Sequence, residues 1–271
     1  MHKTIEESLE ELATFPDREE GLRAIGRYSL YPVVFYRSSD FSHSKRVAWL
    51  LASLEAVITK TFSGSFDIDR ALTMALVHDD AELVTGDYQA GNKSKMTPVE
   101  LAQLDEEERR AIKTMATQFP LLVHGHRYAD MLEDILDYGS TEAQVVKFVD
   151  RFDALGEAMH ELYAGNRVLN TNVINEFGTI PVPVAFYYEK LPMMFQAHLG
   201  LQSLEGMHVL FQTPEIWDWA AVVAHGSPHT LDSFKTPTGH PQYDAWKKVV
   251  LEAGDTEEIQ NLITQKEFLV N

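Results

Sequence analysis

The stretch from Ile68 to Asp87, IDRALTMALVHDDAELVTGD, most constrains what this chain can fold into. Apolar residues recur through it at the spacing of a buried helix face, which predicts one helix over the whole stretch. The same stretch carries a cluster of ionisable residues, namely His78, Asp79, Asp80 and Glu82. Charged groups in a core cost free energy unless they are paired or bind a metal. A histidine beside an aspartate, with a carboxylate one turn later, therefore predicts part of a divalent-metal site.

Two other segments offer ligands that would complete such a site. His43 lies near the start of a predicted helix. Asp150 lies in VKFVDRF, an otherwise apolar part of another predicted helix, and a lone buried aspartate is rare without a partner. Together with His78 and Asp79, these residues predict a four-ligand site with positions left for water and substrate. Without sulfur ligands the choice among Mn, Fe, Co, Ni and Zn stays open.

Most of the remaining chain also has helical period, and no internal repeat or alternation of strands and turns is visible. The predicted fold class is therefore all-α. Thr97-Pro98-Val99-Glu100 is the most complete helix start, with an N-cap, an early proline and an acid at the third position. The helical period is interrupted after Gly165 by a segment rich in Asn, Gly and Pro. We therefore divide the chain into a core with N-terminal helices at residues 1–166 and a helical C-terminal extension at residues 167–271, packed on the core.

Charge and cysteine content narrow the class of partner. The 271 residues include 41 acidic and 23 basic ones, a formal net charge of −18, and no cysteine. Nucleic acids and anionic membranes are bound through lysine and arginine, so neither is expected as a partner. The absence of cysteine excludes disulfides, thiolate zinc sites and cysteine nucleophiles. The N-terminal region is too charged for a signal peptide and no apolar run reaches transmembrane length, so we expect a cytoplasmic protein.

The order of one histidine, a histidine–aspartate pair and a final aspartate on consecutive helices resembles the HD-domain metal-dependent phosphohydrolases. The closer resemblance is to the bacterial HD-domain 5′-deoxynucleotidases, whose HD-x-x-E-x-x-x-GD segment is similar to residues 78–87. Asp150, fifteen residues before Gly165-Asn166, resembles the last metal-binding aspartate of that family. Gly26-Arg27-Tyr28 resembles the arginine–aromatic pair that those enzymes place near the substrate. The resemblance covers about residues 20 to 170.

This resemblance implies an HD-domain helical bundle that holds one divalent cation at four ligands, His43, His78, Asp79 and Asp150. The cation is commonly cobalt or manganese, with iron, nickel, zinc and magnesium as alternatives. The family also implies that Glu82 works with the metal-bound water, which suits a carboxylate one helical turn from His78, and that Asp87 assists at the substrate. Arg27 can bind phosphate through two N–H groups, and Lys93 is a second candidate phosphate contact.

The implied enzyme is a phosphoric monoester hydrolase, or 5′-nucleotidase, in which a metal-activated water removes phosphate from (deoxy)nucleoside 5′-monophosphates. The family also favours a homodimer. Three features depart from its pattern. Ser42 stands where an acidic residue usually precedes the first histidine, and Tyr28 stands in place of tryptophan. The loop after Gly86-Asp87, Tyr88-Gln-Ala-Gly-Asn, lacks the proline-rich shape of the family's pocket. Asp80 is expected to be a solvated neighbour of the ligands or to contact one of them, and receives no catalytic role.

Three alternative functions stay open. A (deoxy)nucleoside triphosphate triphosphohydrolase would use the same scaffold, with residues 167–271 reshaping the pocket. A di-iron HD oxygenase would bind a second metal through His124 and His126, which we expect to be exposed in a glycine-containing loop. A non-enzymatic nucleotide-binding module would keep the metal without the chemistry, but the presence of Glu82 and Asp87 argues against it.

Overall fold

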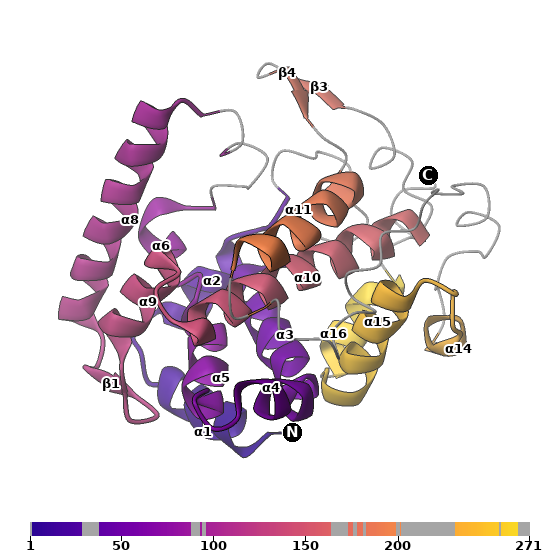
Figure 1. Ribbon diagram of the computed structural model, residues 1–271, viewed down its shortest axis with the longest axis horizontal. Coiled ribbons are helices and arrows are strands. Elements are labelled where there is room, and N and C mark those ends of the chain that lie inside the picture. The colour runs from indigo at the N-terminus through magenta and orange to yellow at the C-terminus, as the bar shows by residue number, and fades with distance from the viewer. Residues whose placement is uncertain are drawn as a thin grey trace. The chain divides into compact units, whose positions relative to one another are not determined.

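The computed structural model describes residues 2–28, 38–87, 93, 96–163, 173–175, 178–180, 183–198, 201, 231–254 and 256–264 (Figure 1). These residues are mostly helical, which confirms the predicted all-α class. The chain forms two compact units, Met1–Tyr28 with Ser38–Asp150 and Ser29–Arg37 with Arg151–Asn271. The boundary between them falls inside helix α10 (Thr141–Tyr163). The division of the chain at residue 166 stays a prediction.

The first unit is a helical bundle in which α5 is central. Its helices are α1 (Lys3–Leu12), α2 (Arg18–Ala24), α3 (Asp40–Ser53), α4 (Glu55–Phe62), α5 (Ile68–Val77), α6 (Glu82–Thr85), α8 (Pro98–Gln118), α9 (Tyr128–Asp137) and the first part of α10. α5 packs against α3, α1 and α9, while α6 packs against α8 and α2. Every residue of α5 from Ala71 to Val77 is buried. The apolar helix α5 is therefore the one that the bundle surrounds.

The predicted single helix over residues 68–87 is wrong, because the chain leaves the helix in the middle of that stretch. α5 ends at Val77 and α6 begins at Glu82. Between them lie four turn residues, His78–Ala81, which we call the HD turn. Its hydrogen bonds join amides and carbonyls three residues apart, as in a 3₁₀ turn. Gly86 then ends α6 with φ of 72°, a conformation that glycine adopts without strain.

Two local features flank the long helix α8. The predicted helix start at Thr97 is confirmed, because its hydroxyl accepts from the Glu100 amide and the Glu100 carboxylate accepts from the Thr97 amide. After α8, strands β1 (Leu122–Val123) and β2 (His126–Arg127) form a short antiparallel hairpin where a loop was expected. Its turn is His124-Gly125, and both residues have positive φ, as in a type I′ turn.

The second unit has a core of its own between α10 and the C-terminal helices. It contains β3 (Val173–Asn175), β4 (Gly178–Ile180), α11 (Pro183–Ala197), α14 (Leu231–Lys235), α15 (Pro241–Ala253) and α16 (Thr256–Thr264), and β3 pairs antiparallel with β4. Trp246 of α15 is fully buried, and its Nε1 donates to Asp153 of α10 at 2.7 Å. Gly156 permits this approach, because a Cβ there would lie 2.2 Å from the Trp246 ring. The C-terminal helices therefore pack on α10 through large aromatic side chains.

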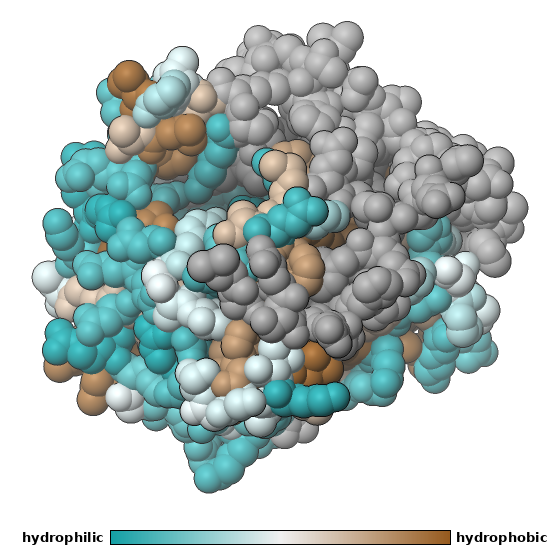
Figure 2. All heavy atoms as spheres, viewed as in Figure 1, coloured by the Kyte–Doolittle hydropathy of each residue, from teal (hydrophilic) through white to brown (hydrophobic). Residues whose placement is uncertain are grey.

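The described surface is largely polar on the face in view. Figure 2 shows hydrophilic residues over most of it, with apolar residues gathered at the N-terminal end of α8. Val99 and Leu101 contribute to that end and are 67% and 41% exposed. Among the residues that the structure describes, no helix is long and apolar enough to cross a membrane.

Candidate metal centre

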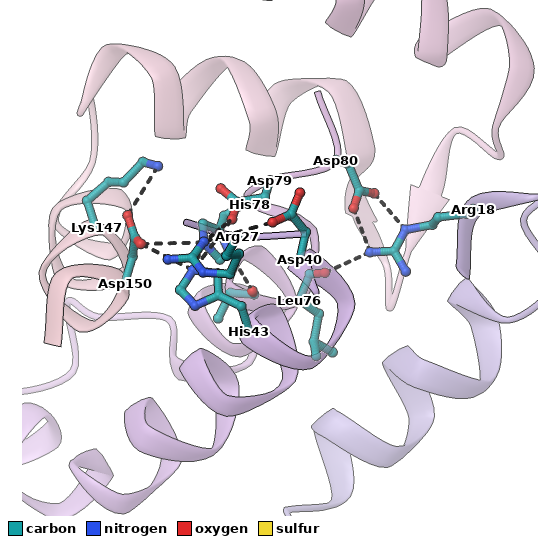
Figure 3. Close-up of polar contacts among 11 residues, drawn as sticks. Arg18, Arg27, Asp40, His43, Leu76, His78, Asp79, Asp80, Lys147 and Asp150 are labelled. Carbon is teal, nitrogen blue, oxygen red and sulfur yellow. Dashed lines mark hydrogen bonds and ion pairs between the residues drawn. The ribbon is translucent and has the colours of Figure 1, made fainter. Parts of the chain in front are cut away.

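The structure brings the four predicted ligands together in the first unit, from α3, the HD turn and α10 (Figure 3). His43 Nε2 lies 3.2 Å from His78 Nε2. Asp150 Oδ1 lies 3.2 Å from His43 Nε2 and 4.0 Å from His78 Nε2. Asp79 Oδ2 lies 3.5 Å and 3.2 Å from the same two nitrogens. All four residues are buried. Two imidazoles and two carboxylates therefore face one small volume.

Four of these five separations fit atoms that share one cation, and the fifth, 4.0 Å between Asp150 Oδ1 and His78 Nε2, would correspond to a wider angle. Two ligand atoms about 2.1 Å from a transition metal, at about 90–110° to each other, lie about 3.0–3.5 Å apart. His78 Nδ1 lies 2.8 Å from the carbonyl oxygen of Ala75, so this nitrogen is the donor and the lone pair of Nε2 faces His43. A lone pair aimed at a second imidazole, between two carboxylates, is the arrangement that a divalent cation satisfies. The residues present therefore fit the implied metal.

The electrostatics of the cluster also suit cation binding. Burial alone would raise the pKa of Asp79, but positive charge at His78 and then at His43 holds it well below its ordinary value, and a bound cation would supply that charge in their place. The Lys147 ammonium lies 3.5 Å from Asp150 Oδ2. A positive neighbour favours the charged form of a carboxylate. Both aspartates are therefore in surroundings that keep them ionised, as metal ligands must be.

Arg27 lies beside the four candidate ligands. Its Nη1 is 3.7 Å from Asp79 Oδ2 and 3.9 Å from Asp40 Oδ1. The guanidinium lies 5.8 Å from the centre of the Tyr28 ring, and 12% of the side chain is exposed. A backbone hydrogen bond from the Arg27 amide to the Ser38 carbonyl joins the end of α2 to the start of α3. The arginine–aromatic pair is thus held at the edge of the site.

Asp40 is a functional candidate that the sequence pattern did not indicate. It is fully buried as the first residue of α3, and its carboxylate, which makes no hydrogen bond of standard geometry within the described residues, lies close enough to Glu82 to interact with it. Burial, and then the neighbouring Asp79 carboxylate, raise its pKa to about 7 against the attraction of Arg27. Asp40 is not needed as a helix cap, because the Ser39 hydroxyl accepts from the Ser42 amide and caps α3.

The two predicted catalytic carboxylates lie close to the same cluster. Glu82 begins α6, and its Oε2 is buried without a hydrogen-bond partner in the part of the chain that the structure describes. Burial, then Asp79, Asp40 and Asp87, raise the pKa of Glu82 well above its ordinary value. A carboxyl group with a raised pKa can take up and return a proton near neutral pH. Glu82 therefore has the surroundings of a general acid or base.

Two other predicted residues make contacts outside the cluster of candidate ligands. Lys93 donates to Glu108 of α8 at 2.8 Å, so its ammonium is engaged by that helix. The amide of His124 donates to the Glu11 carboxylate at 2.6 Å, and its Nδ1 lies 3.8 Å from Glu7. Among the described residues of the first unit, the candidate metal-binding group is His43, His78 and Asp150. Asp79 lies within 3.5 Å of both imidazoles, and neither His124 nor His126 belongs to the group. The second-metal hypothesis for His124 and His126 gains no support from this geometry.

The raised pKa of Asp40 gives a testable pH dependence. Between its ordinary pKa of 3.8 and about 7, the folded protein keeps a proton on Asp40 that the unfolded chain has lost. This contribution to the free energy of unfolding is full at low pH and falls as pH rises toward 7, by about 1.4 kcal/mol per pH unit per proton. Asp40→Asn cannot titrate at this position. With EDTA present, its free energy of unfolding should therefore rise relative to that of the parent as pH increases from about 5 to 7. Urea unfolding at several pH values measures this, and a constant difference would contradict it.

Comparisons with known proteins show the family to which the chain belongs. The family described as 5′-deoxynucleotidase YfbR-like matches residues 19–177. A 5′-deoxynucleotidase of Klebsiella pneumoniae is 30% identical over 150 residues, which cover 54% of this chain and 71% of that protein. The 5′-deoxynucleotidase YfbR of Shigella flexneri is 30% identical over 151 residues, with the same shares. A crystal structure of a Pyrococcus horikoshii OT3 protein shares the fold, with a TM-score of 0.52 and 20% identity over 73% of this chain and 95% of that one. The chain belongs to the YfbR-like 5′-deoxynucleotidase family.

Proposed function

We propose that this chain is a divalent-metal-dependent phosphohydrolase that removes phosphate from (deoxy)nucleoside 5′-monophosphates. The observation that carries the proposal is the convergence of His43, His78, Asp79 and Asp150 in one buried cluster. The relatives matched by sequence are named 5′-deoxynucleotidases, which supports the same reaction here. The substrate is a small nucleotide, because an acidic chain of net charge −18 is unsuited to binding nucleic acid.

The four clustered residues would hold one divalent cation through two imidazole nitrogens and two carboxylates. Cobalt and manganese are the first candidates, and iron, nickel, zinc and magnesium are alternatives, because this donor set is compatible with several of them. When bound, such a cation lowers the pKa of a coordinated water and stabilises charge on phosphoryl oxygens. Asp79 and Asp150 balance the charge of the cation, and the Ala75 carbonyl keeps His78 Nε2 unprotonated.

Glu82 and Asp87 handle the protons in this proposal. Glu82 orients the attacking water and accepts its proton, and the raised pKa lets the protonated carboxyl donate to the departing nucleoside oxygen. Asp87 lies close enough to Glu82 to raise its pKa, and would act on the substrate side of the site. Water attack breaks the P–O bond to the nucleoside, and the products are a nucleoside and inorganic phosphate.

Arg27 would bind the phosphate through paired N–H groups. Lysine carries the same charge but cannot make this two-point contact, so we expect Arg27→Lys to raise KM for a deoxynucleoside monophosphate about tenfold, with a smaller change in kcat. Lys93 remains the proposed second phosphate contact. Because its ammonium is held by Glu108, Lys93→Ala should raise KM less than Arg27→Lys does. Steady-state kinetics measure both values, and an unchanged KM in Arg27→Lys would remove Arg27 from substrate binding.

The proposal also includes a cytoplasmic enzyme that forms a homodimer. Family resemblance supports the homodimer. The acidic composition without cysteine supports the cytoplasmic location. Light scattering on the purified protein measures the oligomeric state directly, and a monomeric mass at working concentration would remove the dimer from the proposal.

Metal analysis separates the nucleotidase from the di-iron oxygenase. We expect about one ion per chain, and phosphate release that stops with EDTA and returns with cobalt or manganese, with or without oxygen. About two iron ions per chain, with turnover that consumes oxygen, would instead favour the oxygenase.

A further inference from the structure

The C-terminal end of α5 is held by donors that lie outside the helix. The last carbonyls of a helix have no partner within it, and other groups must satisfy them. Here three consecutive carbonyls each receive a separate donor: Ala75 from His78 Nδ1 at 2.8 Å, Leu76 from Arg18 Nη2 at 2.7 Å, and Val77 from the Asp80 amide at 2.9 Å. The direction in which the HD turn leaves α5 is therefore fixed by these three contacts.

Arg18 of α2 links this helix end to the carboxylate of Asp80 (Figure 3). Its Nε and Nη2 donate to the two carboxylate oxygens at 2.7 Å and 2.6 Å. The hydroxyl of Tyr128, on α9, donates to the same carboxylate at 2.7 Å. The exposed fractions of the three residues are 2% or less. Burial, and then the Asp80 charge, raise the pKa of Tyr128, so its hydroxyl stays a neutral donor.

The contacts among Arg18, Asp80 and Tyr128 are better explained by orientation of the HD turn than by a gain in stability. A buried ion pair contributes little net stability compared with apolar residues of the same size, because both charges lose their hydration. Its value lies in directional contacts that fix one arrangement of the groups involved. Asp80 directly follows His78 and Asp79, and Arg18 also binds the carbonyl next to the one that orients the His78 imidazole.

We propose that Arg18, Asp80 and Tyr128 are positioning residues that set the affinity of the metal centre for its cation. The inference rests on the proposed function, since it requires a metal at His43, His78, Asp79 and Asp150. If Asp80 shifts, the HD turn shifts with it, and His78 Nε2 and the Asp79 carboxylate lose their alignment with His43. Residues that orient metal ligands typically change metal affinity about 10–100-fold when they are replaced.

Two variants of different severity test this role against a matched control. Tyr128→Phe removes one hydrogen bond to Asp80 and keeps the ion pair, while Asp80→Asn removes the charge that Arg18 binds. Thr73→Val is the control. Thr73 lies on α5, five residues before His78, and the substitution removes a buried hydroxyl contact with Ser8. All three should lower the melting temperature of the metal-free protein. Only the first two should weaken metal binding.

The measurement is the dissociation constant for Mn²⁺ by isothermal titration calorimetry, beside the melting temperature in EDTA. We expect the constant to rise about threefold in Tyr128→Phe and at least about tenfold in Asp80→Asn, and to stay within about twofold in Thr73→Val. Nitrogen chemical shifts of the His78 imidazole provide a second readout, since a displaced HD turn weakens the bond that holds its proton on Nδ1. Should Asp80→Asn fail to fold, Tyr128→Phe decides the matter with both readouts.

The possible results separate this inference from the proposed function. Parental affinity in both Tyr128→Phe and Asp80→Asn, with normal binding by the parent, overturns the positioning role and leaves the metal centre intact. An equal loss of affinity in Thr73→Val also overturns it, because general destabilisation would then explain the effect. A parent protein that binds no Mn²⁺ and no other divalent cation overturns the proposed function and the positioning role together.

Discussion

Asp79→Asn is expected to abolish divalent-metal binding and to reduce phosphate release at least about a thousandfold. Asp79 Oδ2 lies within 3.5 Å of both imidazole Nε2 atoms, so it faces the position that a shared cation would take. Asparagine has almost the same shape but no charge, and its amide group would turn a donor toward one of the nitrogens. Elemental analysis of the purified variant measures the metal, and a phosphate-release assay measures the reaction.

Asp134→Asn is the matched control for this variant. Asp134 is a half-buried aspartate of the first unit, and its Oδ2 accepts from Arg70 Nη2 at 2.5 Å, outside the cluster of candidate ligands. The control should lose stability and keep the parental metal content. Full metal content and full activity in Asp79→Asn would show that Asp79 is no ligand.

Glu82→Gln is expected to keep the metal and lose most of the reaction, with kcat lower by about 10²–10⁴. The carboxylate lies next to Asp40 and Asp79, where burial raises its pKa, and glutamine cannot accept a proton from water. The side chain keeps its length, so the bundle should fold as before. Metal content and kcat are measured on the same preparation, so that loss of chemistry is distinguished from loss of the cation.

Glu142→Gln controls for the loss of a buried glutamate. Glu142 is 8% exposed and accepts a hydrogen bond from the Asp67 amide at 2.8 Å. Asp67 is the N-cap residue of α5, so this contact holds the start of that helix. Its replacement should lower stability and leave kcat near the parental value. Parental kcat in Glu82→Gln would remove Glu82 from the mechanism, and loss of the metal there would make it a ligand instead.

The candidate metal ligands were predictable because the information lies in residue type and order along the chain. A histidine–aspartate pair on an apolar stripe, and a lone aspartate in VKFVDRF, are costly unless they meet a partner. The structure brings His43, His78, Asp79 and Asp150 together as that reasoning requires. Their role as ligands is still a prediction.

The break in the helix at His78 was not predictable from the same pattern. Apolar spacing continues through the stretch to Leu83, so periodicity extends the helix beyond its true end. The end depends on Arg18, which satisfies the Leu76 carbonyl from 58 residues away in the chain. The solvated interpretation of Asp80 is wrong, because Asp80 is fully buried against Arg18 and Tyr128. The alternative, a side chain that supports the ligands, stays a prediction. Contacts between distant segments leave no local signal in the sequence.

The central claim is that this chain uses a bound cation to remove phosphate from nucleoside monophosphates, and product identification tests it most directly. Protein loaded with cobalt or manganese is incubated with a deoxynucleoside 5′-monophosphate and, separately, with the matching triphosphate. We expect nucleoside and inorganic phosphate from the monophosphate, and no tripolyphosphate from the triphosphate. Release of tripolyphosphate with the monophosphate untouched would make the chain a triphosphohydrolase, and no turnover of either nucleotide at full metal occupancy would contradict the phosphohydrolase account.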